Sequence, residues 1–143
     1  MTEIQRSALL PYAAEQVYQL VNDIEAYPQY MDGCVGAEVL ARSDKLVEAR
    51  LDLARGGVRQ SFSTRNQLLE NEAIVLELLE GPFDFFEGRW EFKALGAAAC
   101  KVSLGLQFQV SGAILGAAAG SLFDRVTNNL VDAVSQRARE LYG

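Results

Sequence analysis

The segment "CKVSLGLQFQVSGAILGAAAGSLFDRVTNNLVDAVSQRARELY" (residues 100–142) decides the predicted fold. Its first part alternates apolar and polar residues at the period of a half-buried strand, with one apolar face made of Cys100, Val102, Leu104, Leu106, Phe108 and Val110. From about residue 113 the apolar residues recur at helical spacing, as Leu115, Ala119, Leu122, Phe123, Val126, Leu130, Val134, Ala138 and Leu141. A helix over 113–142 would be roughly 45 Å long, enough to cover a whole sheet.

Alternating segments that precede residue 100 supply the rest of that sheet. Strands are predicted at 2–10 and near 35–41, 47–53, 58–64, 74–78 and 90–92, with one short helix at about 13–24. The turn signals between strands are short, at Gly56-Gly57, Asn71-Glu72 and Gly81-Pro82, which favours antiparallel pairing. We therefore expect one α+β domain over 1–143 with a helix-grip fold, in which a curved antiparallel sheet wraps around a long C-terminal helix.

The composition excludes several classes of function. The chain has 143 residues, no histidine and a net charge of −6, so histidine-based nucleophilic catalysis and histidine metal sites are excluded. The negative charge argues against bulk affinity for nucleic acids, and no DNA partner is expected. No catalytic residue and no metal ligand is predicted, and Cys34 and Cys100 are expected to be reduced and partly buried, as small hydrophobic residues. No signal peptide or bilayer-spanning run is found, which favours a cytoplasmic protein and leaves a peripheral position at the inner membrane open.

Four segments carry a resemblance to a known family. They are "LLPYAAEQVYQLVNDIEAYPQYMDGC" (9–34), "SFSTRNQLLEN" (61–71), "LLEGPFDFFEGRWEF" (78–92) and "AVSQRARELYG" (133–143). In order and spacing they resemble bacterial ribosome-association toxins, which are similar to the mitochondrial coenzyme Q-binding START-like proteins of the polyketide cyclase and lipid-transport superfamily. The resemblance implies a helix-grip fold with a cavity between sheet and helix, and ubiquinone or a related lipid as the ligand class. It also implies that some members bind the large ribosomal subunit and block subunit joining. It transfers no catalytic motif.

The stretch "AYPQYMDGC" (26–34) is unusually apolar for a surface loop. In a helix-grip fold it lies beside the open end of the cavity, so Tyr27, Pro28, Tyr30 and Met31 are predicted to form a lid. The alternative is that these side chains plug the end of the core.

Parity and fold predict the cavity walls, whose residues are Phe62, Thr64, Trp90, Phe92, Leu106, Phe108, Gly116, Phe123, Val126 and Leu130. Ordinary core packing is the alternative for each aromatic residue. The glycines at 112, 116 and 120 would leave open volume along the helix, permit close helix–sheet packing, or belong to a segment that contacts a membrane surface. Tyr30 or Thr64 would orient a quinone head by hydrogen bonding.

The leading interpretation is noncatalytic binding of ubiquinone or a similar hydrophobic lipid in this cavity, in support of respiratory quinone function. Ubiquinone would be a bound ligand and not a cofactor. The alternative is a ribosome-associated toxin that binds the large ribosomal subunit and inhibits subunit joining. For that function a basic strip of Arg50, Arg55, Arg59 and Arg65 on the outer sheet face is the candidate contact surface, against the simpler view that these arginines are solvated strand decoration.

Overall fold

The computed structural model describes residues 1–112 and 115–143, and the side chains of all residues outside 113–117. The elements in chain order are β1 (Thr2–Leu10), α1 (Ala14–Asn22), the 3₁₀ helix η1 (Ile24–Gln29), β2 (Cys34–Arg42), β3 (Leu46–Arg55), β4 (Val58–Leu69), β5 (Ala73–Glu80), β6 (Phe83–Gly96), β7 (Ala99–Val110), α2 (Leu115–Asn128) and α3 (Leu130–Tyr142). Every predicted strand is present.

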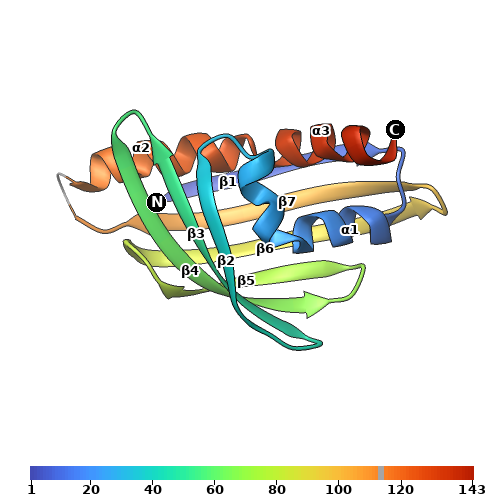
Figure 1. Cartoon of the computed structure of the whole chain (residues 1–143), viewed down its shortest axis with the longest axis horizontal. Helices are drawn as coiled ribbons and strands as arrows, with labels where there is room; N and C mark the ends of the chain where they lie inside the picture. Colours follow the sequence, from blue (N-terminus) through green and yellow to red (C-terminus); the bar gives the residue numbers. More distant parts are fainter. Residues whose placement is uncertain (113–114) are drawn as a thin grey trace.

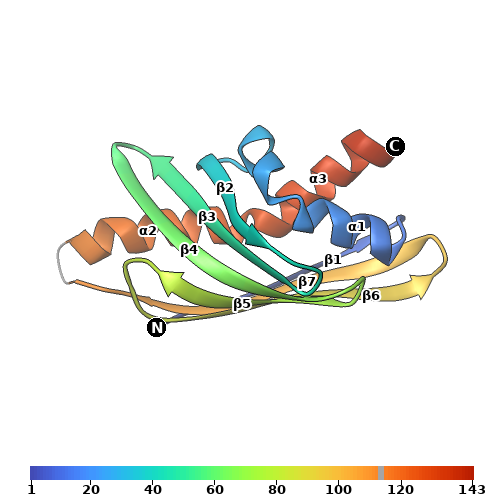
Figure 2. The same cartoon turned by 60° about the horizontal axis from the view of Figure 1, so that its bottom comes forward.

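The strands form one antiparallel sheet in the order β1-β7-β6-β5-β4-β3-β2. Consecutive strands pair as hairpins, except that β1 pairs with β7 at the far end of the chain, from Thr2 opposite Phe108 to Leu10 opposite Cys100. The sheet curls so that its concave face receives α2 and α3, while α1 and η1 cover its remaining end (Figures 1 and 2). The predicted helix-grip α+β fold is confirmed.

The predicted single C-terminal helix is instead two helices, and this part of the prediction is wrong. Asn129 lies between α2 and α3 with φ −101° and ψ −2°. Thr127, Asn128 and Asn129 each donate a side-chain hydrogen bond to the carbonyl four residues earlier, at 2.5, 2.7 and 2.9 Å. Because such side-chain donors compete with the backbone N–H groups for the same carbonyls, three in succession favour a break.

The core fills the space between the concave face and the helices. Val17 and Val21 of α1 are fully buried, and so are Val102 of β7 and Val134 of α3. Both cysteines are free, as predicted, and both are buried rather than only partly buried. Among the described residues, no helix combines the length and hydropathy that a membrane crossing requires.

A cavity between the sheet and helix α2

A small cavity of about 70 Å³ lies between the concave face of the sheet and helix α2. Its walls come from η1, from inward residues of strands β2 to β7, and from α2 and the start of α3. Almost all of the lining is apolar. Pockets that hold drug-sized ligands measure about 300–1,000 Å³, so this cavity must enlarge before it can take a molecule as large as a quinone.

Two of the four residues of the predicted lid contribute to the cavity wall. Tyr27 and Met31 are buried and line the cavity. The Tyr27 hydroxyl donates a hydrogen bond to the backbone carbonyl of Val21, and burial raises the pKa of Tyr27 well above its ordinary value. The Tyr27 hydroxyl is therefore already engaged and does not offer its proton to a ligand.

The other half of the predicted lid lies elsewhere, which corrects the prediction for Pro28 and Tyr30. The 3₁₀ helix repeats every three residues, so Ile24 and Tyr27 share its buried side and Pro28 falls on the exposed side. Tyr30 leaves the helix with φ −142° and packs outside the cavity, where the Arg137 guanidinium lies 5.2 Å from its ring centroid. Tyr30 is thus placed against α3 and does not face the cavity.

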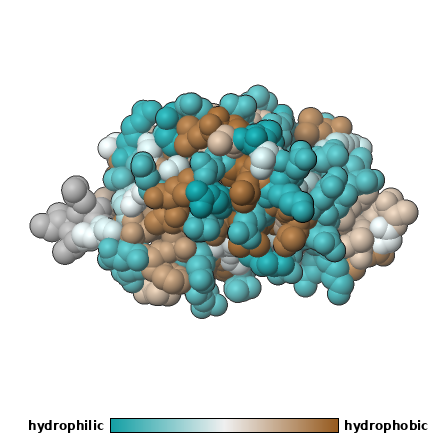
Figure 3. Space-filling view, turned by 90° about the horizontal axis from the view of Figure 1, so that it is seen from below, coloured by the Kyte–Doolittle hydropathy of each residue, from teal (hydrophilic) through white to brown (hydrophobic). Residues whose placement is uncertain are grey.

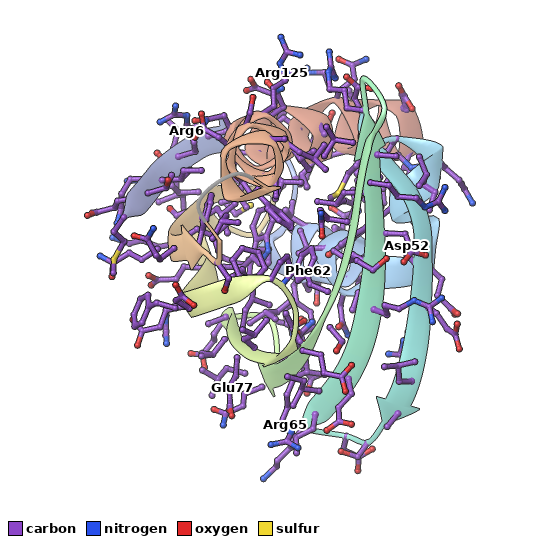
Figure 4. All side chains as sticks on the ribbon, turned by 90° about the vertical axis from the view of Figure 1, so that its left-hand side faces the viewer. Arg6, Asp52, Phe62, Arg65, Glu77 and Arg125 are labelled. Carbon is purple, nitrogen blue, oxygen red and sulfur yellow. The ribbon has the colours of Figure 1, made fainter. Side chains whose placement is uncertain are left out.

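One end of the cavity is filled by five phenylalanines whose ring centroids lie 4.6–6.2 Å apart. They are Phe62, Phe83, Phe86, Phe108 and Phe123. Phe62 points from β4 into the space between sheet and helix (Figure 4). Phe62, Phe108 and Phe123 line the cavity, as predicted. The same three rings also pack against other phenylalanines, so both interpretations of these residues apply.

Phe83 and Phe86 were missed by the sequence prediction. Phe86 has the same parity as Trp90, so strict alternation could have found it. Phe83 has the opposite parity, and it reaches the concave face because the register between β6 and β7 shifts between Phe83 and Phe85. Such a bulge adds one residue to a strand and reverses the parity on its far side.

Trp90 lines the cavity, but Phe92 does not, which corrects the prediction for Phe92. Phe92 stacks on Trp90 at 6.4 Å and meets Tyr18 of α1 edge-on at 5.6 Å. Since α1 covers this part of the concave face, the ring belongs to the closed core. The predicted positions of Leu106, Val126 and Leu130 do line the cavity. The side-chain surroundings of Gly116 lie outside the described residues.

A polar pair from β4 interrupts the apolar wall. The Thr64 hydroxyl donates a 2.8 Å hydrogen bond to Asn66 Oδ1, and both residues are buried and line the cavity. The hydrogen bonds of the described residues include none from the Asn66 amide nitrogen, so this group remains able to donate to a ligand. Asn66 was not predicted, although it follows Phe62 and Thr64 at strand parity.

The predicted basic strip is largely neutralised, which corrects its interpretation as a free cationic surface. Arg50 lies 3.1 Å from Glu38 and 3.4 Å from Asp52. Arg65 lies 2.9 Å from Glu48, which stands directly opposite it on β3. Arg65 and Asp52 both point away from the cavity, on the outer side of the ribbon (Figure 4).

Arg55 and Arg59 differ from these two. Arg55 has the parity of the inward residues of β3 and pairs at 2.5 Å with Asp32, which lies in the turn before β2. Arg59 is exposed on the outer face, and within residues 1–112 and 115–143 it forms no ion pair. Within the same residues no three histidine, cysteine or acidic side chains gather as metal ligands would.

Comparison with known proteins gives the chain's relatives. The family described as "Polyketide cyclase / dehydrase and lipid transport" matches residues 10–135. The chain is 46% identical to the "Ribosome association toxin RatA" of Pseudomonas aeruginosa, over 99% of both chains. It is 25% identical to the mitochondrial "Coenzyme Q-binding protein COQ10" of Dictyostelium discoideum, over 94% of this chain and 67% of that protein.

Solved structures agree with this grouping. A START superfamily protein from Mycobacterium smegmatis matches with a TM-score of 0.79 and 26% identity, over 97% of this chain and 98% of the other. The Zhui aromatase/cyclase from a Streptomyces species matches with a TM-score of 0.84 over 96% and 93% of the two chains, but at 17% identity this likeness shows the fold alone. The helix-grip fold, its apolar cavity and these matches show that the chain belongs to the polyketide cyclase/dehydrase and lipid-transport family.

Proposed function

We propose that this protein binds the large ribosomal subunit in the cytoplasm and inhibits the joining of the two subunits. The observation that carries the proposal is the 46% identity, over 99% of both chains, to a protein named for ribosome association. This interpretation now stands before quinone binding, because the quinone-named relative is only 25% identical and the cavity is small.

The electrostatics constrain how such binding would occur. The chain carries a net charge of −6, and Arg50, Arg55 and Arg65 are engaged by carboxylates. RNA binding depends on cations that displace counterions from phosphates. Arg59 is the member of the strip that a phosphate can reach without first breaking an ion pair, so we propose it as a contact residue.

The test is cosedimentation of the protein with purified large ribosomal subunits at several salt concentrations. The wild-type protein is expected to bind at about 50 mM salt and to lose affinity steeply by about 200 mM. Arg59→Gln is expected to weaken binding and to lower the salt slope by about one. Arg65→Gln, which frees Glu48 at the same face, is the matched control and should have the smaller effect.

A gradient experiment tests the inhibition itself. Small and large subunits mixed with the protein should yield fewer joined particles than the same mixture without it. The absence of cosedimentation even at low salt would contradict the whole proposal.

A second function is supported by the cavity. We infer that it admits an apolar molecule that carries a carbonyl oxygen, such as a quinone, after the walls move apart. The Asn66 amide supplies a donor for that oxygen, and the coenzyme Q name of the Dictyostelium relative supports the same ligand class. Neither function needs a chemical step, so we propose a binding protein and not an enzyme.

The single tryptophan reports on this second function. Trp90 is 4% exposed and lines the cavity, so a quinone inside should quench its fluorescence saturably. A longer tail should tighten binding, because each further buried methylene contributes about 0.8 kcal/mol. Asn66→Leu should weaken the binding of quinones while leaving the emission of the free protein unchanged. Quenching that rises linearly and ignores tail length would count against a quinone site.

A further inference from the structure

The tip of the β6–β7 hairpin has no polar side chain. Its residues, "ALGAAA" (94–99), join the two strands, and all but Ala99 are exposed. Leu95 is 51% exposed. The hairpin projects beyond the helices at one end of the molecule (Figure 1), and that end is pale brown and white where it is seen from below (Figure 3). Exposed turns are ordinarily rich in polar residues, so this tip has an unusual composition.

Two lysines flank the tip at the base of the hairpin. Lys93 and Lys101 are Cα partners in the register of β6 and β7, and both are exposed. Directly opposite residues of an antiparallel pair share a face with Cβ atoms about 4.5–5.5 Å apart, and like charges there are unfavourable. In the part of the chain that the structure describes, neither lysine forms an ion pair. Within the described residues, no carboxylate therefore offsets the repulsion between these two lysines.

An exposed leucine extends this row across a third strand. Leu9 of β1 is the Cα partner of Lys101 and is 71% exposed. The end of the sheet thus presents an apolar tip, a pair of lysines behind it and a leucine beside them. We call this surface, made of Leu9, Lys93, Lys101 and residues 94–99, the hairpin surface.

We propose that the hairpin surface binds the surface of an anionic lipid bilayer, with the tip inserted shallowly among the headgroups and the lysines at the phosphates. The headgroup region suits both parts, because it accepts apolar side chains and attracts cations in the same few ångströms. RNA offers phosphates to the lysines but no layer in which the apolar tip would be buried. A second copy of the chain would bury the tip but bring four lysines together.

Membrane binding at this end is independent of ribosome binding. Its contacts use β6, β7 and β1, whereas Arg59 lies at the β3–β4 hairpin. The interaction is expected to be reversible, since a single short tip and two cations give only marginal anchoring.

Vesicle cosedimentation with the full chain tests the proposal. The wild-type protein is expected to sediment with vesicles of phosphatidylglycerol and phosphatidylcholine and to stay in the supernatant with pure phosphatidylcholine. Loss of each lysine should weaken binding about fivefold, so Lys93→Gln with Lys101→Gln should weaken it about 30-fold and remove most of the salt dependence. Leu95→Ser should weaken it about tenfold through the lost apolar contact.

The β2–β3 hairpin provides the matched control. Arg42→Gln with Lys45→Gln removes the same charge from an equally exposed hairpin and should change binding less than twofold. All variants are exposed substitutions, and circular dichroism verifies that they fold. Three results would overturn the proposal: no binding of wild type to anionic vesicles, equal losses in the lysine and control variants, or a concentration-dependent dimer abolished by Leu95→Ser in the absence of vesicle binding.

Discussion

Gly33 sits where the chain crosses from η1 to β2, and it allows this crossing to press against α2. Its φ is +90°, and a Cβ at this position would lie 2.7 Å from Val126 Cγ2, a side chain of the cavity wall. Its carbonyl accepts a 2.9 Å hydrogen bond from the amide of Ala54. The glycine is thus required both by the backbone conformation and by the closeness of the helix.

Gly33→Ala should lower the free energy of unfolding by about 2–4 kcal/mol, because left-handed strain and overpacking add. Gly57→Ala is the control, since its φ is +81° but nothing lies within 4 Å of its would-be Cβ; it should cost only about 1–2 kcal/mol. Urea unfolding measures both. Combining Gly33→Ala with Val126→Ala should show a favourable coupling, and equal losses at the two glycines would refute the close approach.

The hydrogen bond between Thr64 and Asn66 predicts a non-additive pair of substitutions. Thr64→Val leaves Asn66 Oδ1 buried without its donor and should destabilise the protein by about 1–3 kcal/mol. Thr64→Val with Asn66→Leu removes both polar partners and should recover most of that loss. Thermal and urea unfolding of the single and double variants measure the difference. A double variant less stable than Thr64→Val would contradict this account.

Strand β1 lies at the edge of the sheet and pairs only with β7. Because β1 begins the chain and β7 comes late in it, this pairing joins the N-terminal and C-terminal parts of the fold. Its inward residues Ile4 and Leu10 are buried, while Leu9 is exposed on the opposite face. Arg6 has inward parity, yet it remains exposed because its guanidinium reaches Asn128 Oδ1 at the end of α2. The strand therefore fastens the sheet to the helix break as well as to β7.

Ile4→Ala should cost about 2–4 kcal/mol of unfolding free energy, because it removes buried methyl groups and leaves a cavity. Leu9→Ala on the same strand should change stability by less than about 0.5 kcal/mol. Denaturant unfolding monitored by Trp90 fluorescence reports both. Similar losses at the two positions would mean that the outer face of β1 is covered in solution.

The protein has no histidine, so the dependence of its stability on pH above neutrality comes from its cysteines and tyrosines. These groups are buried by elements from across the whole fold. Burial raises the pKa of Cys34 and Cys100 above 9.0, and burial raises the pKa of Tyr18 and Tyr27 above 10.0. Each of these groups is neutral when folded and ionises more readily when unfolded. The stability they contribute is therefore complete below their ordinary pKa values and is lost as pH rises.

The free energy of unfolding should accordingly be flat from about pH 6 to 8 and decline above about pH 8.5. Cys34→Ala with Cys100→Ala should move the onset of this decline upward, toward the range of the tyrosines. Urea midpoints across pH measure both curves. A step between pH 6 and 7 in the wild-type protein would show that another group controls the linkage.

The fold could be predicted from the sequence, whereas the contacts and the volume of the cavity could not. Strand alternation and helical spacing are local properties, and each decides which side of its element is apolar. Seven such strands and an apolar C-terminal helix admit few arrangements that bury every apolar face. Of the nine predicted wall residues whose surroundings the structure describes, all but Phe92 line the cavity for the same reason.

Only the tertiary structure decided which residues each inward-facing side chain contacts. Phe92 is closed off because α1 happens to cover it, and Phe83 faces inward because β6 gains a bulge against β7. Three of the four arginines of the strip pair with Glu38, Asp32 and Glu48, which lie on other segments of the chain. Periodicity specifies a direction for each side chain, but the partner, the spacing and the remaining volume depend on elements brought together from elsewhere in the chain.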